Sequence, residues 1–223
     1  MHILLSKNND SEKIIHYLMC LIGGFFGSYA LLSRGNFGSA QTANLINLFI
    51  NLGASDFLDA VLRLLALIAF VLLLVISTFI REKFDEESMK YCILVEIMGV
   101  ILIGFIPSRI NELLALLPLF ALSAFQWGIF SGTKEYNSST LFSTGNIREC
   151  INSWVGYRRQ KMNSHFKSKL KPKAVFYTAT LLYYHIGVVF GIYLVTLFDI
   201  KSILFCIIPL IYAFYITQQV EQT

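Results

Sequence analysis

Six long apolar segments constrain this chain more than any other feature of its sequence. They cover residues 14–32, 58–80, 91–106, 113–130, 174–197 and 202–217. A helix needs about 20 largely apolar residues to cross the hydrocarbon core of a bilayer. Charged residues make up 14% of the 223 residues, whereas soluble domains hold about 25%. The sequence therefore predicts an all-α polytopic membrane protein with six transmembrane helices.

The distribution of Lys and Arg predicts how these helices are oriented. If the N-terminus is cytoplasmic, all but four of the 18 Lys and Arg residues fall on the cytoplasmic side. The four exceptions are Arg34, Arg63, Arg109 and Lys201. Because cytoplasmic loops of membrane proteins are enriched in Lys and Arg, we expect a multi-pass protein of the plasma membrane with both termini in the cytoplasm.

The chain divides into two halves that repeat the same order of features. Residues 14–106 and 113–217 each hold an apolar segment, a short polar cluster and two further apolar segments. Cytoplasmic tails are expected at 1–13 and 218–223, and the second half includes a basic cytoplasmic loop at 132–173. Because three spans are an odd number, the chain enters the membrane for the second half from the side opposite to that of the first half. We therefore expect two three-helix inverted repeats, an arrangement that recurs in transporters.

The polar cluster of each half follows its first span. FGSAQTAN occupies residues 37–44 and LFSTGNIR occupies residues 141–148. Both segments are too short and too polar to cross a bilayer alone, so we expect each to begin a half-helix or re-entrant segment inside the protein. Thr42 and Thr144 are the expected caps of these helices, and the free N–H groups at a helix start attract anions or polar ligands. The alternative is that both clusters form interfacial amphipathic helices on opposite membrane faces.

These clusters supply most of the candidate site residues. Gln126 is a further candidate because the Gln126-Trp127-Gly128 run precedes the second cluster as the glycines of the first span precede the first cluster. An amide there can bind a ligand or a neighbouring backbone group. The candidates for solute binding and the half-helices are Gln41, Thr42, Asn44, Gln126, Thr144, Gly145 and Asn146.

Glu96 and His185 are ionisable residues that lie well inside predicted spans. Glu96 is several residues from either end of its span, and His185 follows two tyrosines in another. Ionisable residues inside a membrane are costly and often mark proton or solute pathways, so both are candidates for proton coupling. The alternatives are an interhelical hydrogen bond for Glu96 and a packing role for His185.

Two further patterns concern packing. Asp59 and Arg63 stand four residues apart, which predicts an ion pair on one helix face. Glycines at both ends of 23–27 and of 187–191 have the GxxxG spacing that permits close helix contact.

The two clusters also carry a family resemblance. The runs GGFFGSYALLSRGNFGSAQTANLINL and ALSAFQWGIFSGTKEYNSSTLFSTGNI resemble the YoaK-like family of bacterial membrane proteins, a domain of unknown function. That resemblance implies a bacterial cytoplasmic membrane protein and covers nearly the whole chain. Members of that family carry two Thr-Gly-Asn motifs and an acidic residue in the first span. Here Thr144-Gly145-Asn146 matches, whereas Ala43 replaces the first motif's glycine and Gly27-Ser28 stands at the acidic position.

The remaining motifs narrow the function. The chain has no HExxH, GxSxG, phosphate-binding glycine loop or Cys and His metal cluster, so we expect neither an enzyme nor a cofactor or metal. The basic loop is expected to contact anionic inner-leaflet lipids rather than nucleic acid, and a homo-oligomer is compatible with the sequence. We expect a transporter of an unknown small solute, with a midplane site between the repeats. A channel, or a membrane scaffold that binds lipid or a partner, is the alternative.

Overall fold

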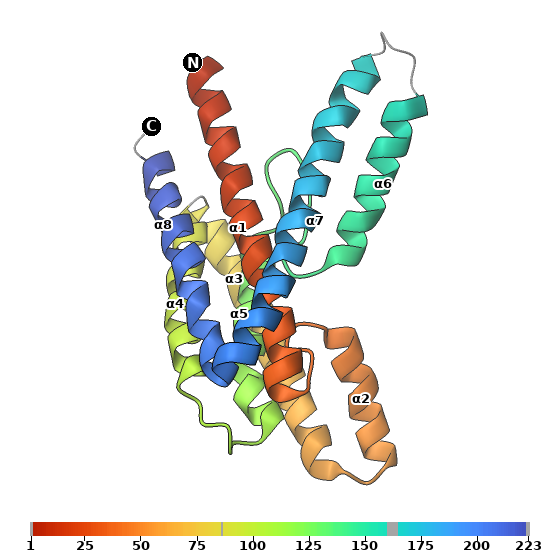
Figure 1. Cartoon of the computed structure of the whole chain (residues 1–223), viewed down its shortest axis with the longest axis vertical. Coiled ribbons are helices and arrows are strands. Elements are labelled where there is room, and N and C mark those ends of the chain that lie inside the picture. Colours follow the sequence, from red (N-terminus) through yellow and green to blue (C-terminus); the bar gives the residue numbers. More distant parts are fainter. Residues whose placement is uncertain (1, 86, 160–164, 222–223) are drawn as a thin grey trace.

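Helices are the regular secondary structure throughout residues 2–85, 87–159 and 165–221, the parts of the chain that the computed structural model describes. An isolated bridge joins Gly132 and Asn137 in the connection between two of them. The elements are α1 (His2–Arg34), α2 (Gln41–Gly53), α3 (Phe57–Phe84), α4 (Glu87–Gly104), α5 (Glu112–Ile129), α6 (Ser143–Arg159), α7 (His165–Phe198), the 3₁₀ helix η1 (Asp199–Cys206) and α8 (Ile207–Glu221) (Figure 1).

Four stretches of helix are long and apolar enough to cross a membrane. They are Asp10–Arg34 in α1, Phe57–Phe84 in α3, Glu112–Ile129 in α5, and Lys167–Gln219, which runs through α7, η1 and α8. The apolar segment expected at 91–106 corresponds to α4, whose 18 residues include Glu87, Lys90 and Glu96. The segment expected at 202–217 begins in η1 and continues in α8. The fold is thus that of an all-helical membrane protein over its described residues.

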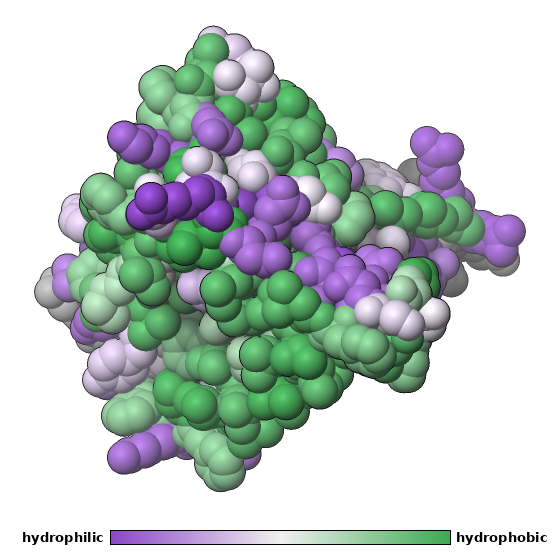
Figure 2. Space-filling model, turned by 90° about the horizontal axis from the view of Figure 1, so that it is seen from below, coloured by the Kyte–Doolittle hydropathy of each residue, from purple (hydrophilic) through white to green (hydrophobic). Residues whose placement is uncertain are grey.

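Large apolar side chains are exposed along these helices. On α3, Leu64, Ile68, Leu72 and Phe79 lie on the surface of the chain. Figure 2 shows apolar residues over much of the end near the α2–α3 connection, with a band of polar residues across it. An exposed apolar surface of this extent marks a membrane or protein interaction site, which agrees with a lipid environment.

Two pairs of long helices form the centre of the bundle. α1 lies against α7, and α3 lies against α5. The short helices pack outside them, α2 on α3 and α6 on α7. α4 and α8 contact each other, while α4 also packs on α5 and α8 on α1. This arrangement leaves α2 and α6 on the same side of the bundle (Figure 1).

Glycines allow α1 and α7 to approach closely. A Cβ added to Gly24 would overlap the carbonyl oxygen of Tyr184, and one added to Gly187 would overlap that of Leu21. The close contact expected from the GxxxG spacing is confirmed for Gly187. By contrast, the nearest atom to a Cβ at Gly27 is the Tyr184 hydroxyl at 3.7 Å, so Gly24 rather than Gly27 makes the contact from α1.

Candidate functional site

The starts of α2 and α6 open onto one cavity of about 520 Å³. In Figure 1 the first residues of both helices lie near the middle of the molecule and their last residues lie toward opposite ends. We call this space the central cavity. It is lined by Ser28 of α1, Ser39 and Ala40 before α2, Ser143 and Thr144 of α6, and Tyr184 of α7, together with apolar side chains.

Asn44 holds the turn that precedes α2. Its side chain is 3% exposed. Its Nδ2 donates to the carbonyl oxygens of Phe37, at 2.9 Å, and Ala40, at 3.2 Å. Its Oδ1 accepts a hydrogen bond of 3.1 Å from Nη1 of Arg63 in α3. The amide therefore ties the loop before the helix to the helix itself and to the neighbouring α3.

Asn146 makes the same pair of bonds before α6. Its side chain is 4% exposed. Its Nδ2 donates to the carbonyl oxygens of Ser139, at 2.7 Å, and Phe142, at 3.2 Å. These acceptors precede Asn146 by seven and four residues, the same separations as in the first turn. Its Oδ1 accepts from the hydroxyl of Ser138 at 3.0 Å.

The bond from Ser138 extends to α1 through His16. The Ser138 hydroxyl has one proton, which it donates to Asn146, so it accepts from Nε2 of His16 at 3.0 Å. His16 must then carry its proton on Nε2. Its Nδ1 is a buried acceptor without a hydrogen-bond partner among the described residues. Asn146, Ser138 and His16 thus form a neutral chain of hydrogen bonds between α6 and α1.

The two threonines do not cap these helices as expected. Ala40 occupies the N-cap position of α2, and no side chain there makes a capping bond. Thr42 lies inside the first turn, so the cap prediction for it is wrong, because a capping side chain must come from the residue before the helix. Thr144 likewise lies inside the first turn of α6. Ahead of α6, Ser139 Oγ accepts from the backbone N–H groups of Leu141 and Phe142, each at 3.2 Å.

Gln41 and Gly145 occupy the first turns of the two short helices. Gln41 begins α2, and its buried Nε2 has no hydrogen-bond partner among the described residues. Gly145 is exposed, and a Cβ added there would have no atom within 4 Å. Gly145 and Asn146 face a second cavity of about 700 Å³.

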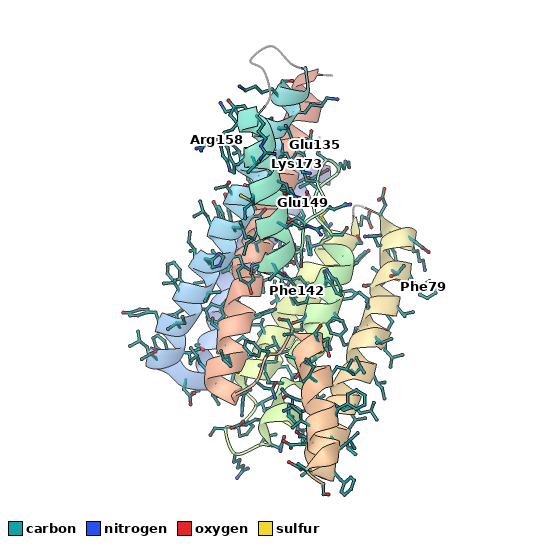
Figure 3. The ribbon with its side chains drawn as sticks, turned by 90° about the vertical axis from the view of Figure 1, so that its right-hand side faces the viewer. Phe79, Glu135, Phe142, Glu149, Arg158 and Lys173 are labelled. Atoms are coloured by element: carbon teal, nitrogen blue, oxygen red, sulfur yellow. The ribbon has the colours of Figure 1, made fainter. Side chains whose placement is uncertain are left out.

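Charged side chains line this second cavity, which we call the charged cavity. They are Glu135, Arg148, Glu149 and Lys173. Figure 3 shows Glu135, Glu149 and Lys173 close together, with Phe142 on the side away from them toward the molecule's middle. Lys173 Nζ lies 2.8 Å from Glu149 Oε2, and this hydrogen bond lowers the pKa of the Glu149 carboxyl below its ordinary value.

Phe142 lines both the central cavity and the charged cavity. Its ring packs edge-on against Trp127, with ring centroids 5.3 Å apart and planes at 86°. Phe142 is therefore the aromatic side chain that lies between the two cavities.

Gln126 is fully buried in α5 and fills a structural role. Its Nε2 donates to the carbonyl oxygen of Met19 and to Thr140 Oγ1, both at 3.0 Å. Its Oε1 has no hydrogen-bond partner within the described chain. Gln126 thereby connects α5 to α1 and to the loop before α6, and it lies outside the linings of the central and charged cavities.

Glu96 and His185 lie apart from these cavities and from each other. Glu96 is fully buried in α4, where its Oε1 accepts a bond of 3.6 Å from Cys92 Sγ. Its Oε2 has no partner among the described residues. His185 is exposed on α7, with Nδ1 2.7 Å from the carbonyl oxygen of Leu181. The structure does not bring either residue to the polar clusters.

Sequence reasoning missed the role of Arg63. The expected ion pair with Asp59 is not among the ion pairs of 4.0 Å or less between described residues, and Arg63 bonds Asn44 instead. Asp59 and Arg63 both line a third, largely polar cavity of about 360 Å³. Their four-residue spacing put both on one helix face, but it carried no signal for an acceptor on α2. His16 and Ser138 were missed for the same reason, since their contacts span 122 residues.

No group of three or more His, Cys, Asp or Glu side chains within the described residues is arranged to hold a metal ion. The candidate functional site is therefore the central cavity, at which the two short helices α2 and α6 of this all-helical membrane protein begin. The chain belongs to the family described as protein of unknown function, DUF1275, which matches residues 15–216. No curated protein and no solved structure matches it.

Proposed function

We propose that this chain is a small-solute transporter whose solute site is the central cavity. The observation that carries the proposal is that the starts of α2 and α6 open onto this one cavity from opposite directions. Broken helices that meet near the membrane midplane form the solute and ion sites of many secondary transporters. The first N–H groups of a helix have no partner within the helix. In α2 the N–H of Gln41 donates to the Ser39 carbonyl oxygen at 2.9 Å, so the N–H groups that follow it are the ones available to a polar solute.

Two inverted repeats, 14–106 and 113–217, are part of this proposal. The contact of α1 with α7 matches that of α5 with α3, because each joins the first long helix of one half to the second long helix of the other. The contacts of α2 with α3 and of α6 with α7 also match. The identical bonds of Asn44 and Asn146 support the same correspondence. Six spans in two three-helix repeats account for all of these matches.

The route for the solute in this proposal passes Phe142. The charged cavity lies on one side of this ring and the central cavity on the other. In this proposal, rotation of the Phe142 side chain opens the passage between the two spaces. Gln41, Thr144 and Gly145 are the candidates near this route, and Asn44 and Asn146 hold the helix starts that border it.

The proposed setting is the plasma membrane of a bacterium, as in the YoaK-like proteins that the chain resembles, with both termini in the cytoplasm. The α6–α7 end would then lie at the inner leaflet. Arg158 and Arg159 at the end of α6, and Lys167, Lys169 and Lys171 at the start of α7, support contact with anionic lipids there.

Proton coupling is the part of the proposal that depends on Glu96. Its unbonded carboxyl oxygen supports a proton-binding role, and its distance from the cavities requires coupling through α4 and α8 rather than direct contact with solute. Glu96→Gln should abolish the dependence of flux on a pH gradient in liposomes while facilitated flux continues. Equal dependence in both proteins would remove Glu96 from the mechanism.

Cysteine accessibility tests the solute route. The native cysteines at 20, 92, 150 and 206 are first replaced. A single cysteine is then placed at Thr144, which lines the central cavity, or at Leu72, which is 54% exposed in the middle of α3. A water-soluble thiol reagent should label Thr144→Cys in intact vesicles and leave the lipid-facing Leu72→Cys unlabelled.

The outcomes separate the alternatives. If Thr144→Cys is as unreactive as Leu72→Cys from both sides of the membrane, the central cavity is dry and the transport route is wrong. A membrane scaffold is then the better description. Single-channel currents in planar bilayers would favour a channel that uses the same cavity.

A further inference from the structure

We infer that the solute of the central cavity is a small organic anion, with its charged group at the starts of α2 and α6 and its apolar part against the apolar wall. This inference rests on the proposed function, since it assigns the chemistry of the same cavity. The sign of the local charge, a hydroxyl without a partner and the composition of the cavity wall support it.

The local charge favours an anion. Peptide dipoles give the N-terminal end of a helix a partial positive charge, and two such ends border this cavity. None of the described residues that line it is Asp, Glu, Lys, Arg or His. The helix starts therefore face no carboxylate in the cavity wall that would neutralise them or hold a cation.

A hydroxyl without a partner also points to a ligand. Ser39 is 9% exposed and lines the central cavity immediately before α2. Its Oγ takes part in none of the hydrogen bonds found among the described residues, in contrast to Ser28 of the same cavity, whose hydroxyl donates to the Phe25 carbonyl at 3.0 Å. The Ser39 oxygen is not one of the fully buried atoms, so the hydroxyl is open to the cavity that Ser39 lines. The Ser39 hydroxyl is therefore a free donor for an anion at the helix starts.

The rest of the wall is apolar. Leu31, Leu32, Leu141, Val188 and Ile192 line the central cavity. Such a surface favours a hydrocarbon group over a fully hydrated inorganic ion. A short-chain carboxylate satisfies both parts of the cavity, with its carboxylate at the helix starts and its chain along these residues.

The test uses three probes of similar size and different charge. Thr144→Cys in the cysteine-free chain is labelled with a neutral thiol reagent in the presence of butyrate, butylammonium or butyramide. Butyrate should slow labelling by about tenfold, the order expected for a charge at favourable helix termini, and the other two probes should have little effect. Asn137→Cys, in the wall of the charged cavity, is the matched control and should be unaffected by butyrate.

A second variant tests the helix starts directly. Ser39→Asp puts a carboxylate where the anion is expected and should abolish protection by butyrate. Asn36→Asp is its control, because Asn36 lies in the same loop but lines the third cavity instead. Asn36→Asp should keep the protection.

Three results would overturn the inference. Protection by butylammonium equal to or above that by butyrate would exclude an anion site. Protection by chloride equal to that by butyrate would exclude the organic part. Labelling of Thr144→Cys that none of the probes slows would show an accessible cavity without anion preference, which leaves the transport route intact, whereas failure to label at all rejects the route itself.

Discussion

The turn before α2 and the turn before α6 use one residue for the same task. Asn44 and Asn146 each donate to carbonyl oxygens seven and four residues earlier. A primary amide has two N–H donors and a carbonyl acceptor, so it can satisfy two loop carbonyls and still accept a bond from another element. No hydroxyl or carboxylate can do the same, which explains why Asn stands at both positions.

The two turns differ in what bonds the amide oxygen. Arg63, a charged side chain in the wall of a polar cavity, donates to Oδ1 of Asn44. The buried hydroxyl of Ser138, which is itself bonded to His16, donates to Oδ1 of Asn146. Hydrogen bonds from charged donors are the stronger ones. When a buried bond between neutral groups is broken, however, water has less access to replace it. The same turn can therefore be stabilised by a charged donor or by a buried neutral one, and loss of the two donors should have different effects.

The largest expected effect comes from replacing each amide by a carboxylate. Asn146→Asp removes both donors and puts a negative charge beside two carbonyl oxygens, at a cost of about 3 kcal/mol or more in unfolding free energy. Asn44→Asp loses the same donors but gains an ion pair with Arg63. Thermal unfolding in detergent should therefore show roughly half the loss for Asn44→Asp. Equal losses would mean that Arg63 does not compensate.

Cutting the outer bond of each turn should have the next largest effect. Ser138→Ala leaves the buried Nε2–H group of His16 with only a weak acceptor, Cys20 Sγ at 3.5 Å, which costs about 1–3 kcal/mol. Arg63→Met leaves Asn44 Oδ1 near a polar cavity where water can replace the guanidinium, so we expect about 1 kcal/mol or less. A greater loss of thermal stability for Arg63→Met than for Ser138→Ala would reverse our ranking of the two anchors. His16→Phe in the Ser138→Ala background should restore part of the loss if the buried N–H is the cause, because the apolar ring has no N–H to leave unpaired.

The first turns of the two helices also differ at one small residue. Ala43 lies in α2 where Gly145 lies in α6. Because a Cβ at Gly145 meets no atom within 4 Å, Gly145→Ala should raise stability by up to about 1 kcal/mol through helix propensity alone. Ala43→Gly should lower it by a similar amount. A destabilised Gly145→Ala protein would indicate that a glycine is needed there for motion or for a ligand.

The smallest expected effect is a dependence on pH that belongs to α6 alone, since α2 has no charged residue. The Lys173 hydrogen bond lowers the pKa of Glu149 in the folded chain. Stability from this pair is therefore present above the ordinary Glu pKa and is lost as the pH falls through the lowered value. The pair is partly exposed, so we expect less than about 1 kcal/mol. Comparison of wild type and Glu149→Gln in acid and at neutral pH should isolate it, and an identical pH profile would contradict it.

The helices and the positions of the two polar clusters could be predicted from the amino-acid sequence, whereas the bonds within the clusters could not. Long apolar segments must form helices in a bilayer, because backbone groups there have no water to bond, and each of the six segments is helical over all or nearly all of its length. The matching clusters around Asn44 and Asn146 were visible because the residues of each lie close together in the sequence.

The contacts between these turns and distant parts of the chain became visible only in the folded structure. Arg63 bonds Asn44 rather than Asp59, and His16 bonds Ser138, which lies 122 residues later in the chain. Glu96 lines none of the cavities described above. These outcomes depend on how α1, α2, α3 and α4 pack, and helix packing is set by side-chain shape over whole surfaces. The physical reason is one of range: local bonds and transfer into lipid can be read along the chain, whereas contacts between distant segments exist only once the chain has folded.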